Sequence, residues 1–215
     1  MSKCRLFIIR HTQTLGNVEK RLTGRQDYEI TEKGKRYIKL LTEKYKNIKF
    51  DAAYSSTSER AIKTIEPLAQ LNNIQIIQDE NLCEMYFGIY DGWKWEDLNK
   101  IHPEIKQNQI NTNEISGIPG QESMTEVAKR MYKCITKIAK NNLGKTVLIS
   151  SHGISIEEFL RKIANKKPNQ DRKKFSQLNT AVNELLYENG KFEILKIGYM
   201  DHLRGGNKKK WGLVL

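Results

Sequence analysis

Apolar and polar positions alternate along the chain with two different periods. Continuous apolar runs with the length and composition of buried β-strands are found at 6–9, 50–55, 74–77 and 146–150. Between these runs apolar residues recur every three or four positions, which is the pattern of a helix that packs on one face. Such helices are expected within 37–45, 61–69, 122–138 and 156–163. Strands that alternate with helices predict an α/β fold.

Local signals sharpen the boundaries of these elements. Thr31 can cap the helix that follows it, because its hydroxyl can accept from a free N–H of the first turn. The longest periodic pattern begins at Glu122. Pro67 lies inside another pattern and is expected to bend or shorten that helix.

A hairpin is expected near the end of the chain. Asn189-Gly190 favours a type I′ turn and is flanked by strand-like segments at 181–187 and 192–199. The whole pattern therefore predicts a three-layer α/β/α sandwich, with a mostly parallel central sheet and an antiparallel edge strand.

One part of the chain does not fit this alternation. The segment 100–120 is polar, contains Pro103 and Pro119, and is typical of a long surface loop. Long loops of this kind often serve as lids. We therefore expect a single domain, 1–215, with an excursion or lid at about 85–120.

Composition restricts the partners and the compartment. The 215 residues carry a formal net charge of +12, which attracts nucleic acid, acidic membranes or phosphorylated metabolites. The three cysteines are far apart and show no zinc spacing, so a reducing compartment without a structural metal is expected. No signal peptide or membrane-spanning run is evident, and a cytoplasmic protein is predicted.

The polar residues at the ends of the predicted strands point to chemistry. Arg10-His11 ends the first strand, His152-Gly153 ends a later one, and Arg60 lies in the first turn of the helix after the second strand. In a parallel sheet these strand ends meet at one edge, where ligands bind. So many cations in one place require an anion, and a phosphate monoester fits. Any one of these residues taken alone is better explained as a capping or packing residue.

Five motifs follow one another along nearly the whole chain. They are Arg10 to Thr14, Tyr54 to Thr64, Leu82 to Gly88, Pro119 to Ser123, and Ser151 to Gly153. In this order they resemble the signatures of the histidine phosphatase superfamily, which includes the cofactor-dependent phosphoglycerate mutases. The segment Leu22 to Arg25 is similar to the substrate loop of that family.

The resemblance implies a phosphoglycerate mutase-like fold and a role for each matched residue. His11 would attack phosphorus, and Glu84 would protonate the leaving oxygen and later activate water. The groups that would hold the phosphoryl oxygens are Arg10, Arg60 and His152. Further substrate contacts are implied for Asn17, Thr23, Gly24 and Gly153. The family implies no metal and no cofactor.

Two positions depart from the family pattern. Thr12 stands where the family usually has Gly, and its side chain would either crowd the phosphate or add a donor. Near Thr23 the phosphatase branch often has Gln, so the contact with the substrate is expected to differ. Two further histidines, His102 and His202, are expected at the surface.

The leading hypothesis is a metal-independent phosphatase that acts on a small phosphorylated metabolite. Its first rival is a cofactor-dependent phosphoglycerate mutase, but the glutamate motif Glu84-Met85-Tyr86 lacks the Arg-His that usually follows the glutamate in mutases. A second rival is a basic module that binds nucleic acid or another anion, and a third is a family member without catalysis. Neither a nucleic-acid signature nor a membrane anchor is evident, and the oligomeric state stays open.

Overall fold

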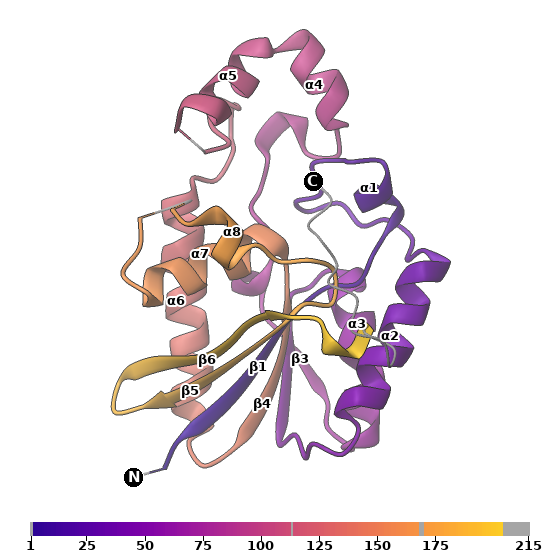
Figure 1. Ribbon diagram of the computed structural model, residues 1–215, viewed down its shortest axis with the longest axis vertical. Coiled ribbons are helices and arrows are strands. Elements are labelled where there is room, and N and C mark those ends of the chain that lie inside the picture. Colours follow the sequence, from indigo (N-terminus) through magenta and orange to yellow (C-terminus); the bar gives the residue numbers. More distant parts are fainter. Residues whose placement is uncertain (1, 113, 168–169, 204–215) are drawn as a thin grey trace.

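A six-stranded sheet lies between two layers of helices in the computed structural model, which describes residues 2–112, 114–167 and 170–203 (Figure 1). The strands are β1 Cys4–Arg10, β2 Ala52–Ser55, β3 Ile76–Gln78, β4 Thr146–Ser151, β5 Val182–Glu188 and β6 Lys191–Tyr199. The helices are α1 Leu15–Val18, α2 Glu32–Tyr45, α3 Glu59–Leu71, α4 Trp95–Ile101, α5 Pro103–Thr112, α6 Met124–Asn141, α7 Gly153–Ile163 and α8 Arg172–Phe175.

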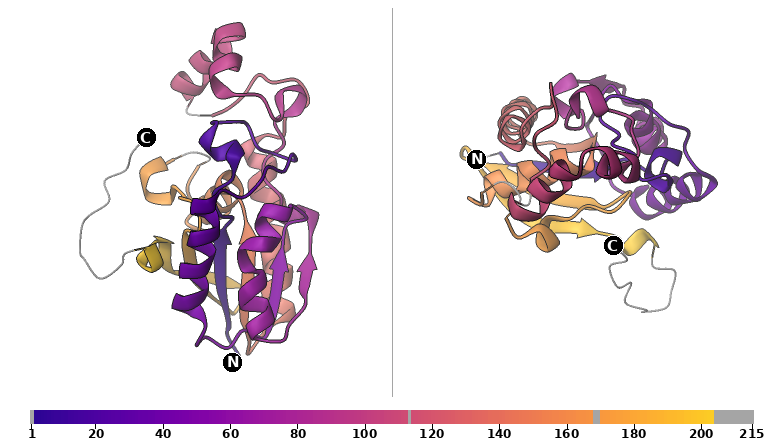
Figure 2. Two further views of the ribbon diagram at one scale, coloured as in Figure 1. Left: turned by 90° about the vertical axis from the view of Figure 1, so that its right-hand side faces the viewer. Right: turned by 90° about the horizontal axis from the view of Figure 1, so that it is seen from above.

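Two separate cores show why both faces of the sheet are covered. In β1, Leu6 and Ile8 face a core shared with α6 and α7, whereas Phe7 and Ile9 face a core shared with α2 and α3. Successive side chains of a strand point to opposite faces, so a fully apolar strand requires helices on both sides. The views in Figure 2 show these layers from the side and from above. The predicted three-layer α/β/α class is confirmed.

The strand order is β3-β2-β4-β1-β5-β6. The first four of these strands are parallel, so β1, β2 and β4 all end at the same edge. The hairpin β5–β6 turns at Asn189 and Gly190, which have the positive φ angles of a type I′ turn. The strand that runs against the others is β5, which pairs with β1, and β6 forms the edge beyond it.

The loop prediction for 100–120 was wrong. This segment holds the whole of α5, and α4 ends at Ile101, just inside it. Proline is compatible with a helix at the first position, where its missing N–H has no partner to lose, and Pro103 occupies that position in α5. Leu98 and Ile105 are buried and attach the two helices to the rest of the molecule.

The structure also differs from the sequence prediction at two helix boundaries. Helix α3 continues through Pro67 to Leu71, so the proline does not shorten it. The ring removes only the bond to the carbonyl of Lys63, which lies on an exposed side of the helix. Helix α6 starts at Met124, because Ser123 and Glu126 form a capping box just before it. The cap predicted at Thr31 is confirmed, since its side chain accepts from the N–H of Gly34.

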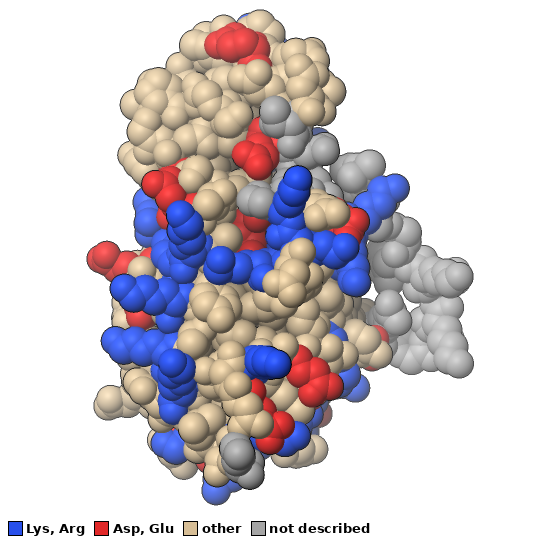
Figure 3. Space-filling view, turned by 90° about the vertical axis from the view of Figure 1, so that its left-hand side faces the viewer, with Lys and Arg blue, Asp and Glu red and all other residues tan. Residues whose placement is uncertain are grey.

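On the face of the molecule shown in Figure 3, Lys and Arg side chains are spread over the middle and lower part and are more abundant there than acidic ones, whereas the upper part is mainly uncharged. The segment 86–121, which includes α4 and α5, instead carries five acidic residues, three lysines and no arginine. Within the described residues, no helix has the length and hydropathy needed to span a bilayer.

Candidate active site

The carboxyl ends of β1 and β4 bring the two motif histidines together. Arg10 is in register with Ser151, and the N–H of His11 donates to the carbonyl of Ser151 at 2.9 Å. The rings of His11 and His152 have their centroids 5.1 Å apart. Arg60 reaches the same place from the first turn of α3. The convergence expected from the strand ends is present.

His11 is buried with only 2% of its surface exposed. Its Nδ1 lies 2.7 Å from the carbonyl oxygen of Thr12, and since a carbonyl only accepts, Nδ1 carries the proton. Burial, with further contributions from Arg60 and Arg10, lowers the pKa of His11 well below its ordinary value. The ring is therefore neutral, and Nε2 has a free lone pair, which is the state that a nucleophile needs.

His152 is also buried and neutral. Burial, Arg60 and the neighbouring His11 lower its pKa well below the ordinary value. A guanidinium nitrogen of Arg60 donates to Nδ1 at 3.2 Å, so Nε2 holds the proton and donates to the hydroxyl of Ser56 at 2.7 Å. Both ring nitrogens are thus oriented by neighbours.

Arg60 is fixed by the predicted substrate loop. It donates to the carbonyls of Thr23 and Gly24 at 3.2 and 2.9 Å, and to the carboxylate of Asp27 at 2.7 Å. The N–H of Gly24 donates in turn to Asp91 at 2.7 Å. A Cβ at Gly24 would lie 2.7 Å from the carbonyl of Met85, so the close approach of these segments requires glycine.

Arg10 ends β1 and lies close enough to Arg60 for the two charges to interact. It donates to the carbonyl of Gln177, and Gly153 packs against it, since a Cβ there would be 3.4 Å from the guanidinium carbon. Burial lowers the pKa of Arg10, while the charges of Glu84 and Glu157 oppose that effect. The Nε of Arg10 and that of Arg60 are buried without a partner in the described part of the chain. Buried unpaired donors of this kind suit an anionic ligand.

Glu84 sits at the amino end of α7. Its carboxylate accepts from the N–H of Ile154 and of Ser155, both at 3.1 Å, and from the N–H of Met85 at 2.9 Å. The first turn of a helix favours a carboxylate because its N–H groups are free to donate. Only 7% of Glu84 is exposed. The carboxylate is therefore held by the first turn of α7, whose N-cap residue is His152.

Sequence reasoning did not identify Arg130, which holds the segment around Glu84. Its guanidinium donates to the carbonyls of Asn81 and Cys83, both at 2.8 Å, and to that of Glu84 at 3.2 Å. Glu122 binds the other edge of Arg130 at 2.6 and 2.9 Å. The sequence feature that could have pointed to Arg130 is Glu122, an acidic residue of the fourth motif that lies eight residues before the arginine.

Thr12 neither crowds the site nor donates into it. Its hydroxyl points to α2 and donates to the carbonyl of Gly34 at 2.8 Å, and its N–H donates to the hydroxyl of Thr64 at 2.8 Å. Its φ is not positive, so the backbone places no demand for glycine at this position.

Asn17 and the far end of the chain complete the site. The Asn17 oxygen accepts from the N–H of Thr14 and from the amide of Asn179, both at 3.1 Å. Asn179 was not predicted.

The expectation of a surface position for His202 was wrong. This ring is buried, and its Nε2 lies 2.8 Å from the hydroxyl of Thr180.

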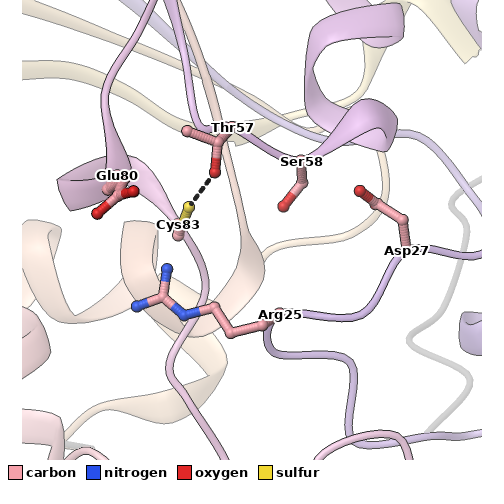
Figure 4. A pocket seen from close by; sticks show the side chains of 6 residues that line it. All are labelled: Arg25, Asp27, Thr57, Ser58, Glu80 and Cys83. Atoms are coloured by element: carbon pink, nitrogen blue, oxygen red, sulfur yellow. Dashed lines mark hydrogen bonds between the residues drawn. The ribbon is translucent and has the colours of Figure 1, made fainter.

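A pocket of about 360 Å³ adjoins the site (Figure 4). It is lined by Arg25, Asp27, Thr57, Ser58, Glu80 and Cys83. Asp27 connects it to Arg60, and Cys83 precedes Glu84 in the chain. Within the described residues, no group of three His, Cys, Asp or Glu side chains is placed to hold a metal ion.

Comparisons with known proteins agree with this geometry. Residues 6–199 match the family model of the histidine phosphatase superfamily, branch 1. A Hydrogenobacter thermophilus protein with the provisional name phosphoserine phosphatase 2 is 32% identical over 149 residues, which are 69% of this chain and 73% of that protein. The Arabidopsis thaliana phosphoglycerate mutase-like protein 4 is 26% identical, over 92% of this chain and 86% of its own.

Solved structures have the same fold. Bacillus stearothermophilus YhfR superposes with a TM-score of 0.86 and 25% identity, covering 94% of this chain and all of its own. The phosphoserine phosphatase of Entamoeba histolytica, solved with 3-phosphoglyceric acid, has a TM-score of 0.81 and 23% identity over 94% of this chain and all of its own. The chain belongs to branch 1 of the histidine phosphatase superfamily.

Proposed function

We propose that this chain is a phosphomonoester phosphatase that acts on a small phosphorylated metabolite through a phosphohistidine. The observation that carries the proposal is the state of His11, which is buried, neutral and oriented by Thr12 so that Nε2 is unprotonated. Two buried guanidiniums with unpaired N–H groups lie beside it. A nucleophilic nitrogen next to donors that suit an anion supports phosphoryl transfer.

In the first step Nε2 of His11 forms a bond to phosphorus while the ester P–O bond breaks. Glu84, in its protonated form, gives its proton to the departing oxygen. In the second step water attacks phosphorus, Glu84 takes a proton from that water, and the P–N bond breaks to release inorganic phosphate. Arg10 and Arg60 would stabilise the oxygens of the phosphoryl group in both steps, and His152 would do so by turning its Nε2–H from the hydroxyl of Ser56 to a phosphoryl oxygen.

The remaining predicted contacts have a supporting position in this proposal. Asn17 would donate its amide N–H to the phosphoryl group, and Gly153 leaves room for the Arg10 guanidinium. Thr23 and Gly24 would act mainly by holding Arg60, because the carbonyls of both residues and the N–H of Gly24 are already paired. The segment 85–120 would form the cover over the leaving group, and no metal or cofactor would be required.

The charge of this cover favours a phosphatase over a mutase. A mutase must retain an acid that carries both a carboxylate and a phosphate while the phosphoryl group is transferred. The segment 85–120 offers no arginine for a bidentate contact with a carboxylate and has two more acidic residues than lysines. The mutase stays as the second candidate because several relatives carry phosphoglycerate mutase names.

The proposal is tested by phosphate release from a panel of phosphorylated metabolites that includes phosphoserine and 3-phosphoglycerate. Wild type should release phosphate equally well with and without a chelator, and His11→Ala should lose at least about a thousandfold in rate, as expected when a nucleophile is removed. An equal rate in both proteins would disprove the role of His11. Interconversion of phosphoglycerates with little free phosphate would identify a mutase.

A further inference from the structure

The loop before β5 crosses the end of the nucleophile strand. The N–H of Thr180 donates to the carbonyls of Arg10 and His11, at 3.1 and 3.3 Å, and the carbonyl of Ala181 accepts from the N–H of Arg10 at 3.0 Å. Asn179, in the same loop, is 168 residues from His11 in the chain. A distant segment therefore fixes the backbone of the two residues nearest the phosphoryl site.

Asn179 extends this contact from the backbone to a site side chain. Its amide nitrogen donates to the carbonyl of His11 and to the side-chain oxygen of Asn17, both at 3.1 Å. The Asn17 oxygen also accepts from the N–H and the hydroxyl of Thr14, at 3.1 and 3.2 Å. Three donors therefore surround one end of the Asn17 amide.

The two ends of an asparagine amide have nearly the same shape, so neighbouring groups decide which end faces a ligand. With its oxygen occupied, Asn17 can present only its N–H₂ group to another partner. A phosphoryl oxygen accepts hydrogen bonds and does not donate them, and an amide turned the wrong way would place two acceptors in contact.

The conformation of Asn179 is itself held by its neighbours. Thr180 has a φ of +62°, which is unfavourable for a β-branched residue and persists only where the surroundings enforce it. Its hydroxyl donates to the carbonyl of Asn179 at 2.6 Å and accepts from Nε2 of the buried His202 at 2.8 Å. The fold thus maintains a strained turn at the position that supplies the Asn179 amide.

We propose that Asn179 is a positioning residue for phosphoryl recognition, which fixes the Asn17 amide with its N–H₂ group toward the phosphoryl oxygens. This inference rests on the proposed phosphatase function. The loop 177–180 lies outside all five motifs, and in this proposal it orients a side chain that binds the phosphoryl group.

The most direct test replaces the donor of Asn179 by an acceptor of the same size. In Asn179→Asp a carboxylate faces the oxygen of Asn17, so the Asn17 amide should turn and present its oxygen to the phosphoryl group. We expect kcat/KM to fall about a hundredfold, because a donor is lost and a repulsion is added. The milder Asn179→Ala removes the constraint without reversing it, and about a tenfold loss is expected.

Calorimetry with inorganic phosphate measures the effect of the Asn179–Asn17 hydrogen bond on binding alone, separately from catalysis. The Kd of phosphate should rise in the order wild type, Asn179→Ala, Asn179→Asp. The matched control is Asn72→Ala, which removes a half-buried amide that bridges Phe50 and Leu68 at the opposite end of the sheet. This variant should lose stability while kcat/KM and phosphate affinity stay within about twofold of wild type.

A double-mutant cycle separates positioning from general damage to the fold. If Asn179 acts through Asn17, Asn179→Ala should have no further effect on phosphate affinity once Asn17→Ala is present. Equal losses in both backgrounds would overturn the inference, and so would an Asn179→Asp protein with wild-type affinity. Neither result depends on His11→Ala, the variant that tests the proposed function itself.

Discussion

Replacing Thr12 by glycine restores the residue that the family motif usually carries, and the structure predicts a loss of stability without a gain in activity. Thr12 is completely buried, and its hydroxyl donates to the carbonyl of Gly34 in α2. The side chain therefore joins the loop after β1 to a helix on one face of the sheet. It points away from the proposed phosphoryl site, so its removal should leave that site intact.

The expected cost of Thr12→Gly has three parts. Loss of the hydrogen bond to Gly34 costs about 1 kcal/mol. Loss of the buried methyl group costs about 1 kcal/mol. The greater flexibility of glycine in the unfolded chain costs about 0.5–1 kcal/mol. The free energy of unfolding should therefore fall by about 2.5–3 kcal/mol, whereas Thr12→Ser, which keeps the hydroxyl, should lose about 1 kcal/mol.

Urea denaturation measures both losses, and steady-state kinetics measures the activity. The kcat/KM of Thr12→Gly should stay within about threefold of wild type at a temperature where the variant is fully folded. A tenfold rise would refute the reasoning, because it would mean that the threonine side chain hinders the reaction. Unchanged stability would refute it as well, because the bond to Gly34 would then contribute nothing.

Two further predictions follow from the burial of charged and titratable groups. The pKa values of His11, His152 and His202 are lowered, that of His202 to about 4, so the unfolded chain takes up protons before the folded one as the pH falls. Above about pH 6.5 these three histidines add no pH dependence to the stability. Below pH 6.5 the stability should decline by up to about 1.4 kcal/mol per pH unit for each histidine. Urea denaturation at pH 7.5, 6.0 and 5.0 can follow this decline, and a stability that rises toward pH 5 would contradict it. Arg130→Met removes the hydrogen bonds to the carbonyls around Glu84, and kcat should fall about a hundredfold. The control Arg36→Met changes an exposed arginine and should keep wild-type kcat. Equal kcat values in the two variants would exclude a role for Arg130.

The site residues that the hydrophobic pattern predicted follow the ends of apolar strands. Arg10 ends β1, His11 comes next, and His152 follows β4, so the pattern was enough to place them at one edge of a parallel sheet. The resemblance to the family was needed for the other predicted residues, which are Asn17, Thr23, Gly24 and Glu84. The layers were predictable for the same reason, because strands that are apolar on both faces require helices on both sides.

The residues that were missed act through backbone carbonyls that are distant in sequence. Arg130 holds the carbonyls around Glu84, and Asn179 holds the carbonyl of His11. A carbonyl has the same chemistry at every residue, so no side-chain pattern marks it as a partner. His202 was placed at the surface for a related reason, since its burial depends on how the last described segment returns to Thr180 and to Tyr45 of α2, and that path has no local signal.

The helices α4 and α5 were missed because their amphipathic pattern is short and weak, and their prolines and polar residues are equally typical of loops. The cover that would select the substrate is thus the least predictable part of the chain. Its few buried anchors, such as Leu98 and Ile105, leave most of its surface free to vary.

The first turn of α7 positions both the residue proposed to transfer protons and one residue proposed to bind the phosphoryl group. His152 caps this helix, and the N–H groups of its second and third residues, Ile154 and Ser155, hold the carboxylate of Glu84. The proposed proton donor and one proposed phosphoryl ligand are therefore fixed to the same rigid turn, although they are 68 residues apart in the chain. In the proposed mechanism, a change in α4 or α5 would alter which leaving group is admitted and would leave Glu84 and His152 in place. Reaction chemistry would then depend on α7, and substrate choice on α4 and α5.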